Sequence, residues 1–112
     1  MERRRSKRKN ICMEAEIVQG DTTYTVITES ISEHGINLET SSGYLLSTST
    51  RFNPGTEFEV KLRTPSGELI KLHCKVIWSF KTAPHGLKRK VGLEIIFPPP
   101  TYVDFYKNPQ HS

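Results

Sequence analysis

Residues 70–78 read IKLHCKVIW, and this run decides the class of fold. Every second side chain in it is apolar: Ile70, Leu72, Cys74, Val76 and Trp78. Lys71, His73 and Lys75 stand between them. Successive side chains of a β-strand point to opposite faces, so this alternation predicts a strand with one buried and one solvated face. We expect Trp78 to share the buried face, Cys74 to be a small core residue and His73 to be a surface histidine.

The same alternation continues on both sides of this run. It predicts further strands in residues 11–17, 22–28, 36–39, 57–62 and 91–97, the last with Val91, Leu93, Ile95 and Phe97 on its apolar face. Tight turns are expected at Gly20-Asp21, Pro54-Gly55 and Pro65-Ser66-Gly67, and loops at residues 40–50 and 81–90. Six short antiparallel strands with one apolar face each predict an all-β fold, either a small closed barrel or a sandwich.

The C-terminal segment differs from the rest. Pro98-Pro99-Pro100 should end the last strand, and residues 101–107 are expected to form one or two helical turns. Their apolar side chains would pack back on the strands: Tyr102, Val103, Phe105 and Tyr106. We divide the chain into a flexible basic arm (1–9), a β-barrel (10–97) and a proline stop with a C-terminal tail (98–112). Because a six-stranded barrel is filled by its own side chains, a ligand would have to bind on its outer wall.

The composition limits the class of protein further. With 112 residues, 35% of them hydrophobic and 25% charged, the chain is expected to be one soluble domain. It has no apolar run long enough for a membrane span, and no apolar stretch follows the basic N-terminus as in a secretory signal. Cys12 and Cys74 fit neither a disulfide framework nor a metal motif, which favours a reducing, cytoplasmic location.

Catalytic patterns are absent from the sequence. It contains no glycine-rich phosphate loop ending in Lys-Ser/Thr, no Gly-x-Ser-x-Gly and no His-Glu-x-x-His, and its four histidines are scattered. We therefore expect no enzymatic activity, no metal and no cofactor.

The positive charge is concentrated at the N-terminus. Residues 1–9 hold six basic side chains and one acidic one, a net charge of +5, whereas the other 103 residues sum to −1. Such an arm attracts the phosphates of a nucleotide, a nucleic acid or an anionic lipid, although many basic tails are simply solvated. Arg4 and Arg8 could close around one ligand only if the arm folds, because in an extended chain they lie roughly 13 Å apart.

A second feature is Ser30-Ile31-Ser32-Glu33-His34-Gly35, expected between the second and third strands. We interpret it as a tight turn whose hydroxyls point outward. Gly35 would supply a positive φ or room for a close ligand. An ordinary Ser/Gly hairpin loop would have the same composition.

Taken in this order, the features resemble the PilZ domain family, the bacterial receptor modules for cyclic di-GMP. Members carry Arg-Arg-x-x-x-Arg, then Asp/Asn-x-Ser-x-x-Gly, then Val-Gly-x-x-x-x-Phe in a late strand. The matching residues here are Arg3-Arg4-x-x-x-Arg8, Ser30-x-Ser32-x-x-Gly35, and Val91-Gly92 with Phe97. The resemblance covers about residues 2–97 and implies a six-stranded antiparallel β-barrel.

The resemblance also implies which residues bind. Arg4 and Arg8 would clamp the phosphates and the guanine edge, and Ser32 would hydrogen-bond the nucleotide from the barrel surface. Gly35 would hold the turn, and Arg3 would contact a second, intercalated nucleotide.

Ser30 departs from the family pattern, because members have Asp or Asn there. A single hydroxyl pairs less fully with guanine than a carboxylate or an amide, so binding should be weaker by roughly 1–3 kcal/mol.

Three functions follow from these features. The first is a cyclic di-GMP receptor whose arm folds over the nucleotide and changes the surface that an unidentified downstream protein reads. The second, which Ser30 leaves open, is a PilZ-like adaptor that binds no nucleotide and acts through protein contacts in motility or pilus machinery. The third is a nucleic-acid-binding barrel. We expect no nucleic-acid polymer as a partner, because few outward aromatic side chains should alternate with basic ones.

Overall fold

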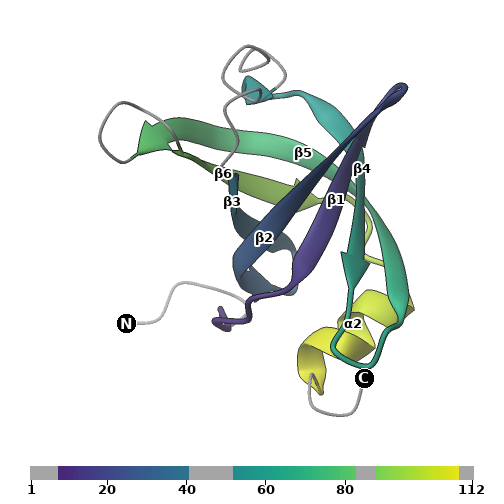
Figure 1. Ribbon diagram of the computed structural model, residues 1–112. Coiled ribbons are helices and arrows are strands. Elements are labelled where there is room, and N and C mark those ends of the chain that lie inside the picture. The colour runs from purple at the N-terminus through teal and green to yellow at the C-terminus, as the bar shows by residue number, and fades with distance from the viewer. Residues whose placement is uncertain (1–7, 41–51, 83–87, 109–112) are drawn as a thin grey trace.

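The computed structural model describes residues 8–40, 52–82 and 88–108. It contains the strands β1 (Glu14–Gln19), β2 (Thr22–Ser32), β3 (Gly35–Thr40), β4 (Glu57–Arg63), β5 (Leu69–Thr82) and β6 (Lys88–Ile95), and the helix α2 (Pro100–Lys107). The strands pair antiparallel and close into a barrel in the order β1-β2-β3-β6-β5-β4 (Figure 1). The predicted six-stranded antiparallel barrel is confirmed, and the sandwich does not form.

Alternate side chains from the strands fill the interior. Ile17, Leu38, Val60 and Cys74 are all 0% exposed, as their place in the alternation predicts. Burial raises the pKa of the Cys74 thiol to about 12, so it stays protonated and packs as a small apolar group. With the interior occupied in this way, the outer wall is where a ligand can bind.

Several strand boundaries differ from the prediction. β1 begins at Glu14 and not at residue 11. β5 and β6 run on as a long ribbon beyond the barrel (Figure 1), so the loop predicted at 81–90 is wrong at both ends. The reason is that the ladder continues, with Lys81 opposite Arg89 and Thr82 opposite Lys88. The loop predicted at 40–50 lies outside the described residues except for Thr40, which ends β3.

The chain also leaves β6 earlier than predicted. Phe97, expected on the apolar face of this strand, is 91% exposed and has a φ of +52°. This left-handed backbone is rare outside glycine. It redirects the chain into the three prolines, so that α2 can fold back over one end of the barrel (Figure 1).

The predicted C-terminal helix is confirmed. Tyr102, Phe105 and Tyr106 are buried against the barrel, and Val103 is half-buried. The Tyr102 hydroxyl donates a hydrogen bond to the Ser32 carbonyl oxygen, at 2.6 Å. No helix in the described part of the chain is long and apolar enough to cross a membrane.

A β-bulge in β2 changes which of its side chains face outward. Thr28 and Ser30 pair with consecutive residues of β3, so Glu29 between them is an extra residue. One extra residue shifts the alternation by one position. Even-numbered side chains point inward as far as Thr28, but beyond the bulge it is Ile31 that is buried in the core. Ser30 and Ser32 therefore reach the outer wall.

A second β-bulge acts in the same way on β5. Val76 and Trp78 pair with consecutive residues of β6, so Ile77 is the extra residue. Val76 is 1% exposed, whereas Trp78 is 37% exposed. The prediction that Trp78 shares the buried face is therefore wrong, because the bulge turns the indole to the outer wall.

Candidate functional site

A hollow of about 440 Å³ lies on the outer wall, a size typical of small-molecule sites. It is lined by Arg8, Ser32, His34, Gly35, Asn37, Ile77, Trp78, Gly92, Leu93 and Glu94. These residues come from the segment before β1, the β2–β3 turn and strands β2, β3, β5 and β6. Both bulged strands contribute, so the bulges bring their outward side chains to one place.

Arg8 covers the two serines of β2. Its Nη1 donates a hydrogen bond to Ser30 Oγ at 3.2 Å, and its Nη2 donates to Ser32 Oγ at 3.4 Å. The backbone of the next residue holds the arginine in place: Lys9 N donates to Ile31 O at 2.7 Å, and Ile31 N donates to Lys9 O at 2.8 Å. The structure therefore brings together Arg8 and the serine motif, which are more than twenty positions apart in the sequence.

The predicted outward hydroxyls need a correction. Ser30 and Ser32 lie within the end of β2, and only Glu33 and His34 form the turn. Both serines are on the outer wall, yet Ser30 is 6% and Ser32 9% exposed. Their hydroxyls face the Arg8 guanidinium and not open solvent, because the chain before β1 packs over them.

Gly35 lies where neighbouring groups leave little room for a side chain. A Cβ here would come within 3.2 Å of Leu93 O, 3.3 Å of Arg8 Nη2 and 3.3 Å of Ser32 Oγ. Of the two alternatives predicted for Gly35, a positive φ or room for a close ligand, the positive φ is not observed, because the glycines with positive φ in the described residues are Gly20, Gly55 and Gly67. A side chain here would crowd the guanidinium and the serine hydroxyl, which would have to shift by a few tenths of an ångström.

Gly92 and Trp78 form the opposite part of the hollow. A Cβ on Gly92 would lie only 2.3 Å from the indole Cε2 and 2.4 Å from Nε1, so the ring occupies the space that a side chain would need. Phe80 stacks on the indole, with ring centroids 5.4 Å apart and an interplanar angle of 23°. Sequence reasoning missed this contact. The signal for it was Val76-Ile77-Trp78, three consecutive apolar residues that interrupt the alternation.

The remaining groups make the hollow chemically mixed. Asn37 supplies an amide, His34 an imidazole and Glu94 a carboxylate, whose Oε1 lies 4.0 Å from Lys75 Nζ. A guanidinium suits phosphate oxygens, and an aromatic surface suits a planar base. Within residues 8–40, 52–82 and 88–108, no group of three or more His, Cys, Asp or Glu side chains could hold a metal ion. The hollow therefore offers a guanidinium and an indole, the kinds of group that contact phosphates and planar bases, beside one carboxylate.

Outward aromatic and basic side chains do occur together on the β5–β6 ribbon. Phe80 is 51% exposed and sits opposite Lys90 across the two strands, and Lys81 and Lys88 are also exposed. The ribbon thus places outward aromatic and basic side chains side by side, and the absence of a nucleic-acid partner stays a prediction. The cause of this arrangement is the bulge at Ile77, which moves the aromatic residues outward.

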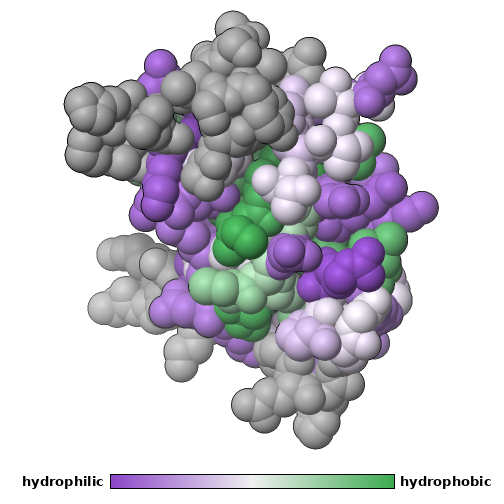
Figure 2. All heavy atoms as spheres, in the orientation of Figure 1, coloured by the Kyte–Doolittle hydropathy of each residue, from purple (hydrophilic) through white to green (hydrophobic). Residues whose placement is uncertain are grey.

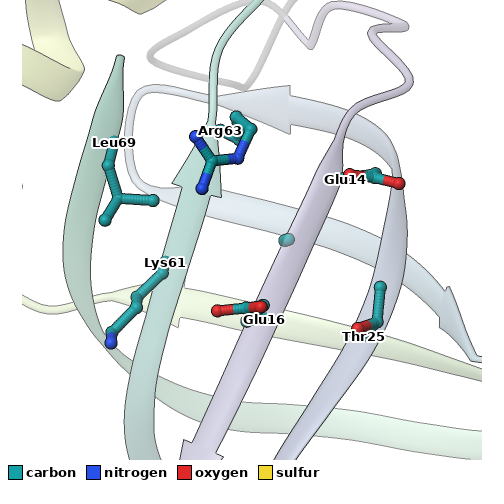
Figure 3. A pocket seen from close by; sticks show the side chains of 7 residues that line it. Glu14, Glu16, Thr25, Lys61, Arg63 and Leu69 are labelled. Atoms are coloured by element: carbon teal, nitrogen blue, oxygen red, sulfur yellow. The ribbon is translucent and has the colours of Figure 1, made fainter. Parts of the chain in front are cut away.

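A second, smaller hollow lies over β1, β2 and β4. Figure 3 shows Glu14 and Glu16 on β1, and Lys61 and Arg63 on β4. Its two acidic and two basic side chains balance in charge, and the arm residues Arg8 and Lys9 do not line it. Its Arg63 is therefore a suitable comparison for an arginine that belongs to the first hollow. The face in Figure 2 carries mainly hydrophilic side chains around a smaller apolar area, as on an ordinary protein surface.

The arm is described only in part. Arg8 and Lys9 lie on the barrel. Lys9 Nζ donates a hydrogen bond to the carbonyl oxygen of Tyr106 at 2.5 Å and lies 4.4 Å from the centre of the Tyr106 ring. The predicted site residues Arg3 and Arg4 lie outside the described residues.

The sequence model of the PilZ domain family matches residues 2–103. This range includes the basic arm, all six strands and the beginning of α2. No curated protein matches the chain.

Solved structures share the fold at low sequence identity. The Bacillus subtilis inhibitor of motility (MotI/DgrA) has a TM-score of 0.74 and 21% identity over 93% of this chain and 47% of its own. The PilZ domain with c-di-GMP of YcgR from Escherichia coli has a TM-score of 0.69 and 12% identity over 95% and 87%. The K. pneumonia MrkH–c-di-GMP complex has a TM-score of 0.72 and 13% identity over 96% and 50%. This chain spans about half the length of the first and the third.

Proposed function

Since this chain belongs to the PilZ domain family, we propose that it is a receptor domain that binds cyclic di-GMP in the hollow beneath Arg8. PilZ domains are receptor or adaptor modules, and two of the similar structures contain c-di-GMP. The observation that carries the proposal is the Arg8 guanidinium, held over Ser30 and Ser32 beside an exposed indole.

Arg8 provides the anchor for phosphate in this proposal. A guanidinium presents its N–H donors in a planar fork, a geometry that suits phosphate oxygens. Its position is set by the backbone pairing of Lys9 with Ile31, so little conformational entropy is lost at this residue when a ligand binds. The base would pack against Trp78, where stacking contributes about 1–3 kcal/mol per base.

The rest of the arm completes the site. Arg4 would reach the O6/N7 edge of guanine and Arg3 a second nucleotide, both from the chain that precedes Arg8. Holding residues 4–7 in one conformation costs about 4–8 kcal/mol in backbone entropy. Charge-assisted hydrogen bonds contribute about 1.5–3 kcal/mol each, so two or three of them offset the cost. Arm closure over the nucleotide would change the surface that an unidentified cytoplasmic partner protein reads.

Calorimetry with cyclic di-GMP tests this function. We expect binding by the native chain and loss of measurable binding in Arg8→Ala and Arg4→Ala. Arg63→Ala is the matched control, because this exposed arginine lines the second hollow and should bind as the native chain does. Melting temperatures of the ligand-free variants show that folding is preserved. Unchanged affinity in Arg8→Ala would exclude the clamp.

Two further titrations separate the other functions. Single-stranded RNA or DNA in moderate salt tests the aromatic and basic β5–β6 ribbon, where steeply salt-dependent binding would indicate a nucleic-acid-binding barrel. A chain that binds neither nucleotide nor polymer would be the adaptor, and the 91% exposed Phe97 is a side chain that a protein partner could bury.

A further inference from the structure

The first position of the serine motif is poorly suited to read a base. Ser30 is 6% exposed, and its hydroxyl already accepts a hydrogen bond from Arg8. The Watson–Crick edge of guanine presents the O6 acceptor beside N–H donors, and a single hydroxyl can satisfy only part of that pattern. If the hollow binds guanine, another side chain must pair with its edge.

Asn37 stands beside Ser30 on the outer wall. The two residues are register partners across β2 and β3, because the bulge at Glu29 brings Ser30 into line with Asn37. Ile36 and Leu38, its neighbours along β3, are both 0% exposed and point into the core. The Asn37 side chain therefore points outward, where it lines the hollow with Arg8 and Trp78.

The surroundings of Asn37 leave its amide accessible. Across β3 and β6 the register partner of Asn37 is Gly92, which has no side chain to cover the amide. Across β6 and β5 the register partner of Gly92 is Trp78. Asn37 is half-buried, so its side chain is partly ordered by packing. In the part of the chain that the structure describes, its amide makes no hydrogen bond to another protein group. The Asn37 amide and the Trp78 indole thus lie at the same level of three neighbouring strands, separated by Gly92.

We propose that Asn37 recognises the guanine edge in place of the acidic or amide residue that Ser30 replaces; this inference rests on the proposed function. The amide oxygen would accept a hydrogen bond from guanine N1–H, and the amide nitrogen would donate to O6. Because Asn37 is the register partner of Ser30, its amide on β3 would place a base-reading group at the same level of the barrel as the motif position on β2.

A set of variants titrated with cyclic di-GMP tests the proposal. We expect Asn37→Ala and Asn37→Ser to weaken binding roughly 10-fold or more, as the loss of a paired base contact does. Asn53→Ala is the control, because Asn53 is an exposed asparagine in the turn before β4 and does not line the hollow. Melting temperatures should be unchanged, because the Asn37 amide makes no hydrogen bond to the described chain.

The decisive variant is the exchange Ser30→Asn with Asn37→Ser. It returns the amide to β2, and we expect it to recover most of the affinity that Asn37→Ser loses. A structural role of Asn37 would not be rescued in this way. Native binding with unchanged affinity in Asn37→Ala would overturn the assignment and leave the receptor function intact. Absence of cyclic di-GMP binding by the native chain would overturn both.

Discussion

The contact between Gly92 and Trp78 allows a sharp test of the site, because one methyl group added at position 92 should displace the indole. In Gly92→Ala, the new Cβ would lie 2.3, 2.4 and 2.7 Å from three indole atoms. Ordinary van der Waals contact begins near 3.4 Å, so the ring has to move away by about 1 Å or more. The indole cannot move toward Phe80, which stacks on it, and must instead swing into the hollow or out into solvent.

The expected cost follows from this geometry. Overpacking of this kind lowers the free energy of unfolding by about 1–3 kcal/mol. For a domain of this size that corresponds to a fall in melting temperature of roughly 4–12 °C. Binding of cyclic di-GMP should fall by roughly 10-fold or more, because the base loses its stacking surface.

Trp78 is the only tryptophan in the chain, so its fluorescence reports on this contact directly. We expect the emission of Gly92→Ala to shift before any ligand is added, to longer wavelength where the ring swings into solvent and to shorter wavelength where it swings into the hollow. Gly20→Ala is the control for stability alone. Gly20 has a φ of +59° and open space around its Cβ position, so alanine there strains the turn without touching the hollow. Gly92→Ala with native emission, melting temperature and affinity would refute the packing described for Trp78.

Three other substitutions or modifications test the framework around the site. Thr28→Val keeps the shape of a 0% exposed side chain but removes a hydroxyl that makes hydrogen bonds with two backbone groups before β1, at 2.9 and 2.6 Å. In urea unfolding, the free energy of unfolding should fall by about 2–4 kcal/mol. A fall below about 0.5 kcal/mol would contradict this role. Tyr102→Phe should cost about 1 kcal/mol in the same assay, because the Ser32 carbonyl loses a donor; unchanged stability would argue against that bond. Iodoacetamide should modify the exposed Cys12 in the folded protein and Cys74 only after unfolding, because burial raises the pKa of the Cys74 thiol to about 12. Mass spectrometry of the labelled peptides measures both reactions, and labelling of Cys74 in the folded protein would contradict this prediction.

Much of the candidate site could be predicted from the sequence. The arginine spacing and the serine motif identified Arg8, Ser30, Ser32 and Gly35, and the structure brings these four together. The prediction that these four residues lie close together came from the resemblance to a known family, because nothing in the spacing alone places residue 8 against residue 32. Arg3 and Arg4 stay predictions.

Asn37, Gly92 and Trp78 could not be predicted in the same way. Gly92 stands in a recognisable Val-Gly motif and Trp78 ends a run that interrupts the alternation, but neither pattern places them beside Asn37. Their common place in the hollow depends on which strands are neighbours, since β3 pairs with β6 and β6 with β5, far along the chain. The requirement for glycine at position 92 exists only because an indole from another strand takes the space.

The amino-acid order by itself determined the number of strands, their inward faces and the closing helix, because burial of apolar side chains follows a period of two that can be read locally. The tertiary structure alone decided that Asn37, Gly92 and Trp78 line the same hollow as Arg8 and Ser32. Two inserted residues, Glu29 and Ile77, reverse the alternation in β2 and β5, and a reversal of this kind is set by pairing with the neighbouring strand and not by hydrophobicity.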